Sequence, residues 1–136
     1  MMKTRSCALA LSAALLFGAS ESRAQSALLE GNPVEGAIDF HVHSGPDTVA
    51  RNLSDVMVAE LARKRGMRGI VLKNHMTMTA DRAALVQEQV PGLEVFGGVV
   101  LNEPVGGLNP DAVEVMATMD GGRGKVVWLP TRSAQH

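Results

Sequence analysis

The sequence AIDFHVHSGPD, residues 37–47, determines how the rest of the chain is interpreted. Its apolar first half has the length of a buried β-strand, and the Ser-Gly-Pro-Asp that follows is typical of a loop. Three similar apolar runs follow, at residues 68–72, 93–101 and 125–129. Successive runs begin 31, 25 and 32 residues apart, close to the roughly 30 residues that one strand and its crossover helix occupy. We therefore predict a repeated strand-helix unit.

The segments between these runs have the features of helices. Apolar residues recur every three or four positions over 53–64, and Gly66 then stands where a helix commonly ends. Thr79 is a candidate cap for a second helix over 80–89, and Asn109-Pro110 is a favourable start for a third. Strands that alternate with helices predict an α/β fold with a parallel sheet and right-handed crossovers. Functional side chains are then expected at the carboxyl ends of the strands.

The first 24 residues have the three parts of a secretory signal peptide. Lys3 and Arg5 precede 13 apolar residues, 7–19, and small residues then lead to a cleavage site after Ala24. Thirteen apolar residues are too few to span about 30 Å of hydrocarbon, so we expect no stable membrane anchor. We predict a periplasmic or secreted protein. Cys7, the one cysteine, would leave with the signal, which excludes disulfides and thiolate metal sites.

Removing 24 of the 136 residues leaves 112, with a leader at 25–36 and a domain at 37–136. The composition, 46% hydrophobic and 20% charged, is that of a globular protein. The net charge is −1 and aromatic residues make up 3% of the chain. A protein with so little positive charge and so few stacking surfaces is not expected to bind nucleic acid.

Two histidines and an aspartate alternate along the first strand. Alternate residues of a strand share a face, so Asp39, His41 and His43 are expected to point the same way. Two imidazoles this close can bind one divalent ion, with the carboxylate as a further ligand or as a partner of the imidazoles. The alternative is a pair of polar residues on a solvated strand edge. The position at a strand's carboxyl end, before a loop, favours the metal.

The second strand ends in Val71-Leu72-Lys73-Asn74-His75. The same alternation places Lys73 and His75 on one face, so a third imidazole and a cation reach the same edge. His75 has a structural alternative, a hydrogen bond within the following loop. Lys73 has three alternatives: it binds a substrate anion, it becomes a metal ligand after carbamylation, or it pairs with an acidic neighbour.

From Ile38 to Thr79 the sequence resembles the start of metal-dependent hydrolases of the amidohydrolase superfamily and of the related polymerase-and-histidinol-phosphatase type. Both have a His-x-His at the end of the first strand of a TIM-type barrel, as His41 and His43 are placed here. The second type has a further histidine after the second strand, matched by His75, and a third-strand glutamate, which Glu103 matches only three residues late. Four strands are about half of the eight in such a barrel. The resemblance thus implies the N-terminal part of a larger domain.

These features together predict a metal-dependent hydrolase that acts on an amide, ester or phosphoester bond of a small molecule. His41, His43 and His75 would hold the metal, with the terminal His136 as a candidate fourth ligand. Imidazole and carboxylate ligands favour zinc or manganese, which would activate a bound water. The candidate catalytic residues are Asp39, Lys73 and Glu103: the lysine would anchor substrate, and either carboxylate would act as general base.

Two other interpretations remain open. Met76 and Met78 beside His75 could add thioether ligands, which would make the protein an exported copper-binding protein without turnover. The chain could also be an inactive fragment of the hydrolase. A half-barrel exposes two sheet edges, so a homo-oligomer that completes the barrel is a further expectation.

Overall fold

The computed structural model describes residues 31–134. The predicted signal peptide, its cleavage site after Ala24 and the candidate ligand His136 lie outside these residues. All described strands and helices belong to one compact unit that begins at Val34. No helix within residues 31–134 has the length and apolar character needed to cross a membrane.

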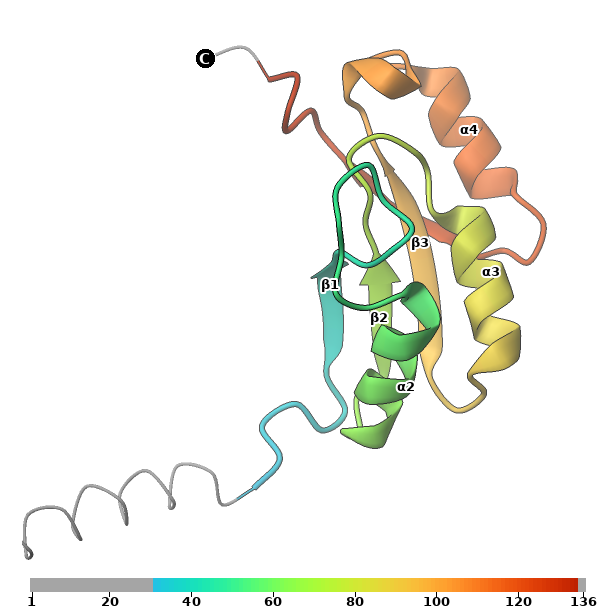
Figure 1. The fold of residues 1–136 in the computed structure, drawn as a ribbon. Helices are drawn as coiled ribbons and strands as arrows, with labels where there is room; N and C mark the ends of the chain where they lie inside the picture. The colour runs from blue at the N-terminus through green and yellow to red at the C-terminus, as the bar shows by residue number, and fades with distance from the viewer. Residues whose placement is uncertain (1–30, 135–136) are drawn as a thin grey trace, which may run out of the picture. The chain divides into compact units, whose positions relative to one another are not determined.

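Strands and helices alternate along the described chain, as the sequence predicts (Figure 1). In order they are β1 (Ile38–Val42), α2 (Asp55–Lys64), β2 (Gly69–Leu72), α3 (Ala80–Gln89), β3 (Glu94–Val100), the short 3₁₀ helix η1 (Glu103–Val105), α4 (Pro110–Thr118) and β4 (Gly124–Trp128). The four strands form one parallel sheet in the order β1-β2-β3-β4. The predicted α/β class and parallel sheet are therefore confirmed, with strand bounds within one residue of those expected.

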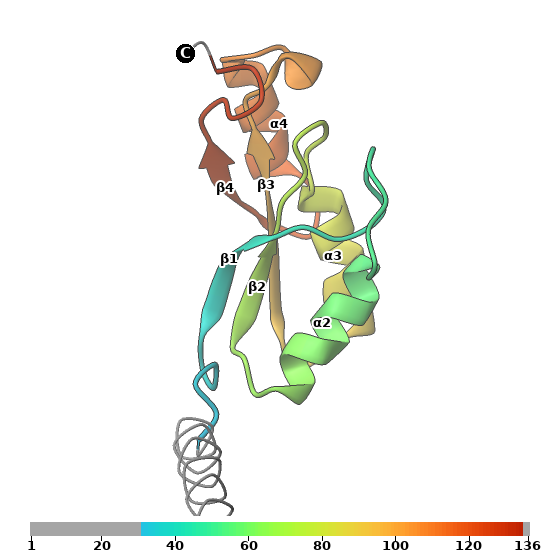
Figure 2. The same ribbon diagram turned by 60° about the vertical axis from the view of Figure 1, so that its left-hand side comes forward.

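The helices α2, α3 and α4 lie together on one face of the sheet (Figures 1 and 2). Each connection leads to the next strand in the same direction across the sheet, and crossovers of one hand then return every helix to the same side. The opposite face has no helix among the described residues. The sheet thus has a covered face and a bare face, and these two names are kept below.

The helix starts follow the sequence with one exception. Asn109 caps α4, since its side chain accepts hydrogen bonds from the N–H groups of Asp111 and Ala112. Thr79 precedes α3 but does not cap it with its side chain. Its hydroxyl donates to the Leu72 carbonyl at 2.6 Å and accepts from the Gly98 N–H at 2.9 Å. The predicted cap is wrong at this position, because the buried hydroxyl joins β2 to β3 instead.

The hydrophobic core lies between the covered face and the helices. Its larger cluster joins β1, β2 and β3 to α2 and α3 through Val42, Ala59, Ala62, Ile70, Leu72, Ala83, Val86, Val90, Leu93 and Val95. The second cluster packs α4 against the sheet through Ala80, Val99, Leu101 and Met116. Gly97 and Gly124 permit the close approach: a Cβ there would stand 2.2 Å from the Thr79 carbonyl oxygen and 2.0 Å from that of Met116. The covered face therefore has the close packing of a protein interior.

The bare face carries apolar side chains without a cover in the described chain. They surround a hollow of about 320 Å³ lined by Ile38, Phe40, Val71, Phe96, Lys125 and Val126. Phe40 is 59% exposed, which is high for an aromatic side chain on a sheet. This hollow lies at the level of the strands themselves, and the polar residues that follow the strands lie beyond it.

The pairing of β1 with β2 contains an irregularity. Asp39 is opposite Ile70 and Val42 is opposite Leu72, so three residues of β1 correspond to two of β2. Such a bulge interrupts the strict alternation of side chains. It lies at the position of His41, and it changes where this imidazole can point.

Candidate metal centre at the carboxyl edge of the sheet

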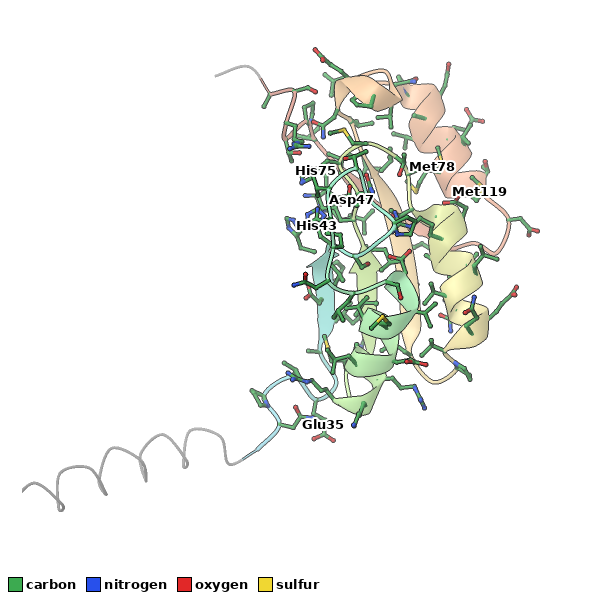
Figure 3. The ribbon with its side chains drawn as sticks, viewed as in Figure 1. Glu35, His43, Asp47, His75, Met78 and Met119 are labelled. Atoms are coloured by element: carbon green, nitrogen blue, oxygen red, sulfur yellow. The ribbon has the colours of Figure 1, made fainter. Side chains whose placement is uncertain are left out.

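Three imidazoles meet at the carboxyl ends of β1 and β2. His41 belongs to β1, His43 directly follows β1, and His75 lies three residues after the end of β2. The Nε2 atoms of His41 and His43 are 3.1 Å apart. The rings of His43 and His75 are stacked, with their centroids 4.7 Å apart (Figure 3). The three histidines predicted as ligands are thus neighbours in space, although His75 is more than thirty residues from the other two.

Lys73 completes this group from the end of β2. It is 4% exposed, and its Nζ lies 3.4 Å from His41 Nε2 and 5.0 Å from the centre of the Trp128 ring. Burial lowers the pKa of Lys73, because the ammonium loses its hydration. The side chain therefore lies between an imidazole and an aromatic face.

Two of the imidazoles, those of His43 and His75, lie in surroundings that disfavour their protonation. Burial lowers the pKa of His43, and the positive charges of His75 and Arg51 lower it further. Burial also lowers the pKa of His75, as do Lys73 and Arg132, while Asp47 acts in the opposite direction. A neutral imidazole has a free nitrogen lone pair, which is the form that binds metal ions.

His75 is held by a hydrogen-bond network from β3 and the segment after β4. Its Nδ1 lies 3.0 Å from Thr131 Oγ1. Asn102, 1% exposed, donates from Nδ2 to the His75 carbonyl and to Thr131 Oγ1. Its Oδ1 accepts from three consecutive N–H groups, those of residues 131–133. One buried amide therefore fixes both the backbone and the ring partner of His75.

Asn102 and Thr131 were not identified from the sequence. Asn102 follows the apolar run of β3 by two residues, at the same edge as Lys73 and His75. That position is a signal that the rule of functional residues at strand ends could have used. Nothing in the sequence pairs Asn102 with Thr131, because the contact depends on how the segment after β4 returns to β3.

A buried ion pair fixes the loop that follows His43. Arg82 of α3 donates from Nε and Nη2 to the two carboxylate oxygens of Asp55, both at 2.7 Å. Asp55 also accepts from the Ser44 hydroxyl at 2.6 Å, and Ser44 directly follows His43. Planar, bidentate pairs of this kind are strong and directional. The network ties the end of β1 to both α2 and α3.

A second carboxylate of this loop, Asp47, lies near the imidazoles (Figure 3). Its side chain is 3% exposed, and Arg51 donates to Oδ2 at 2.7 Å. Burial alone would raise the pKa of Asp47, but the hydrogen bonds from Arg51 and from the Thr48 N–H outweigh it and lower that pKa. Asp47 is thus an ionised carboxylate already paired with a cation.

The other residues predicted for the site lie apart from the three imidazoles or outside the description. Asp39 is exposed, and its carboxylate accepts from the His41 N–H at 2.8 Å. Glu103 is exposed in η1, where its N–H donates to Ser133 Oγ. Among the described residues neither carboxylate forms a hydrogen bond with an imidazole ring. Met78 packs against the second hydrophobic cluster on the covered face, and His136 is outside residues 31–134.

The distance between the ring nitrogens of His41 and His43 is suited to binding one divalent ion. Two imidazole nitrogens bound at about 2.0–2.1 Å to one zinc ion lie about 2.9–3.4 Å apart for angles of roughly 90–110° at the metal, and those of His41 and His43 are 3.1 Å apart. The buried Nδ1 of His43 has no hydrogen-bond partner among the residues that the structure describes. Within residues 31–134 no group of three or more His, Cys, Asp or Glu side chains has the arrangement of a complete metal site. Two nitrogens, those of His41 and His43, therefore have the spacing of neighbouring metal ligands.

Comparison with protein families gives one finding for this region. The model of a family of unknown function, DUF6282, matches residues 36–136, which include all the described strands and helices and the three clustered imidazoles. Neither the curated proteins nor the solved structures gave a match.

Proposed function

The chain belongs to DUF6282, a family of unknown function, and we propose from the chemistry of its own side chains that it is a metal-dependent hydrolase. The observation that carries the proposal is the meeting of His41, His43 and His75 at the carboxyl edge of a parallel sheet. In α/β folds this edge is where active sites are built. Imidazole nitrogens spaced as neighbouring ligands are suited to zinc or manganese.

The proposed fold is about half of a TIM-type barrel. Consecutive parallel strands with all helices on one face are the arrangement of such a barrel. The bare face would then be the inner face, and the imidazoles would lie at its catalytic end. The substrate would be a small molecule with an amide, ester or phosphoester bond.

His41 and His43 would hold the metal ion, with His75 as the third imidazole. A bound zinc or manganese ion supplies an activated water at neutral pH and polarises the bond to be cleaved. Thr131 and Asn102 would orient the His75 ring, as the partners of metal-ligating histidines commonly do. Lys73 would bind the substrate or stabilise charge that develops on it.

The general base is the least defined part of the proposal. Asp39 is close to His41 in sequence, and Glu103 is at the carboxyl end of β3. Both carboxylates are exposed, so a water can reach either of them. Substitution of each by its amide would identify the base, because only the base variant should lose turnover while retaining metal.

The experiment that tests the proposed function compares metal content. The wild type and the double variant His41→Ala/His43→Ala are purified without chelator and analysed for zinc and manganese. We expect at least one ion per chain in the wild type. The metal content of the variant should be about tenfold lower, since two of the ligands are removed. Asp120→Ala, at an exposed turn distant in sequence from the site, is the control and should retain the metal.

Equal metal content in the wild type and the double variant would contradict the proposal. Where metal is bound, ester, amide and phosphoester substrates are assayed with and without a chelator. Metal-dependent cleavage of one class would support hydrolysis and identify the bond. Bound metal with no cleavage of any class would leave a metal-binding protein and contradict the enzymatic part.

A further inference from the structure

Lys73 is a buried cation whose carboxylate partner is missing from the described chain. It is 4% exposed, and no ion pair of this lysine occurs within residues 31–134. Its neighbours are His41 Nε2 and the face of Trp128, one an imidazole nitrogen and the other an aromatic surface. Buried charges in proteins are normally paired with an opposite charge, because desolvation of a lone ion is costly.

The carboxylates near the site are occupied by other groups. Asp47 is paired with Arg51, and Asp55 is paired with Arg82. Asp39 accepts from a backbone N–H of its own strand. The nearby acidic side chains described here are therefore directed to other partners, and Lys73 is left without one.

Further positive groups surround the same point. The charges of Arg51 and Lys73 act on His43, and those of Lys73 and Arg132 act on His75. Arg51 is neutralised by Asp47, but Arg132 is exposed and forms no ion pair among residues 31–134. The backbone of Arg132 is fixed by the buried Asn102, so its position relative to His75 is defined. The site thus has two cations that form no ion pair within the described part of the chain.

We propose that the substrate of this site carries a small oxyanion group, a carboxylate or a phosphate, that binds to the Lys73 ammonium. This inference rests on the proposed hydrolase function, because only an enzyme has a substrate. The Trp128 ring covers one side of the ammonium through a cation–π contact, so the donors that remain face the imidazoles. An oxyanion there accepts hydrogen bonds from Lys73, and the positive charge of Arg132 attracts it to the site.

The test is a titration of the metal-free full-length protein at constant pH and ionic strength. Inorganic phosphate and acetate are the two probes. Their binding is measured by calorimetry and by the shifts of amide and imidazole NMR signals. We expect saturable binding of one probe or both, with shifts concentrated at residues 41–43, 73–75 and 131–133. Preference for phosphate or for acetate then identifies which oxyanion the site is built for.

The decisive variant is Lys73→Met, which keeps the length of the side chain and removes its charge. Affinity should fall at least about tenfold, since a charge-assisted hydrogen bond is lost. Lys73→Arg should retain part of the binding. Lys64→Met, at the exposed end of α2, is the matched control and should bind as the wild type does.

Other outcomes separate this proposal from the proposed hydrolase. Unsaturable binding, shifts spread over the surface, or equal affinity in the wild type and Lys73→Met would overturn the oxyanion site. If Lys73→Met does not fold, the wild-type NMR titration alone decides, because the site predicts shifts at the three named segments. Oxyanion binding that persists in a protein without metal affinity would support this site and contradict the hydrolase.

Discussion

The covered face and the bare face of this sheet are made of the same four strands, yet they differ in almost every physical respect. On the covered face Ile70, Val95 and Val99 are at most 1% exposed, and glycines allow helices to approach the strands closely. On the bare face Phe40 is 59% exposed and apolar side chains line a hollow. The imidazoles and Lys73 belong to the carboxyl end of this second face. Packing is thus concentrated on one side of the sheet and chemistry on the other.

The two faces differ in whether other parts of the described chain cover them. A parallel sheet is nearly always covered on both faces, because its strands are apolar on both. The covered face already satisfies this rule within the described chain. The bare face combines exposed apolar area with Lys73, which forms no ion pair in the described chain. Exposed apolar area of this kind is characteristic of an interaction surface. Substitutions on the two faces should therefore have different consequences.

The largest effect is expected from Gly97→Ala on the covered face. The new Cβ would stand 2.2 Å from the Thr79 carbonyl oxygen, so β3 and the start of α3 must separate. We expect a loss of more than about 3 kcal/mol in the free energy of unfolding, measured by chemical denaturation. Gly45→Ala is the matched control, because its nearest atoms are 3.7 Å away. Equal losses in the two variants would show that the close packing described for β3 and α3 is wrong.

Removal of the buried carboxylate of Asp55 should have the next largest effect. Asp55→Ala leaves Arg82 without its bidentate partner and frees the Ser44 hydroxyl. We expect a loss of about 3 kcal/mol, at the lower end for a broken buried pair because Arg82 retains some access to water. Glu88→Ala, an exposed residue of α3, should change stability by less than about 0.5 kcal/mol. An unchanged free energy of unfolding in Asp55→Ala would contradict a structural role for this pair.

A smaller loss, of about 2 kcal/mol, is expected from Asn102→Ala. The substitution removes the hydrogen bonds to His75 and to residues 131–133, but solvent can replace some of them because Thr131 and Arg132 are exposed. The NMR signals of the His75 ring should also broaden or shift, since its partner Thr131 is no longer fixed. Asn52→Ala, at an exposed loop position, is the control. An unchanged His75 signal would show that Asn102 does not position that ring.

The smallest effect is expected on the bare face. Phe40→Ala should change the free energy of unfolding by less than about 1 kcal/mol, because the ring is already largely in solvent. Val95→Ala removes fewer atoms but should cost about 2 kcal/mol, because Val95 is 0% exposed in the core. A larger loss for Phe40→Ala than for Val95→Ala would mean that the bare face is covered in solution. Sedimentation of both variants would then show whether a second copy of the chain provides the cover.

Much of the secondary structure could be predicted, because it depends on local patterns. Apolar runs of strand length predicted β1 to β4, and Asn109-Pro110 predicted the start of α4. The predicted side-chain cap at Thr79 was wrong for a tertiary reason, because its hydroxyl forms hydrogen bonds with β2 and β3 instead. The bulge in β1 was not predictable either, since it depends on the pairing of β1 with β2.

The candidate site divides in the same way. Its histidines and Lys73 follow from the rule that strand ends gather at one edge, which needs only the order of the elements. Two further contacts join residues more than twenty positions apart: the hydrogen bond between Asn102 and Thr131, and the ion pair between Asp55 and Arg82. No local pattern specifies such partners, because the distance between them is set by how helices and loops pack.

The sequence by itself determined the α/β class, the parallel sheet and the three imidazoles at its carboxyl edge, because these depend on hydrophobic periodicity and on residue type. The tertiary structure alone decided which nitrogens approach one another, which carboxylates are already paired, and that Lys73 is buried with no carboxylate partner among residues 31–134. The physical reason is that charge pairing and desolvation depend on distances in space. Those distances exist only once the helices have packed against one face and left the other bare.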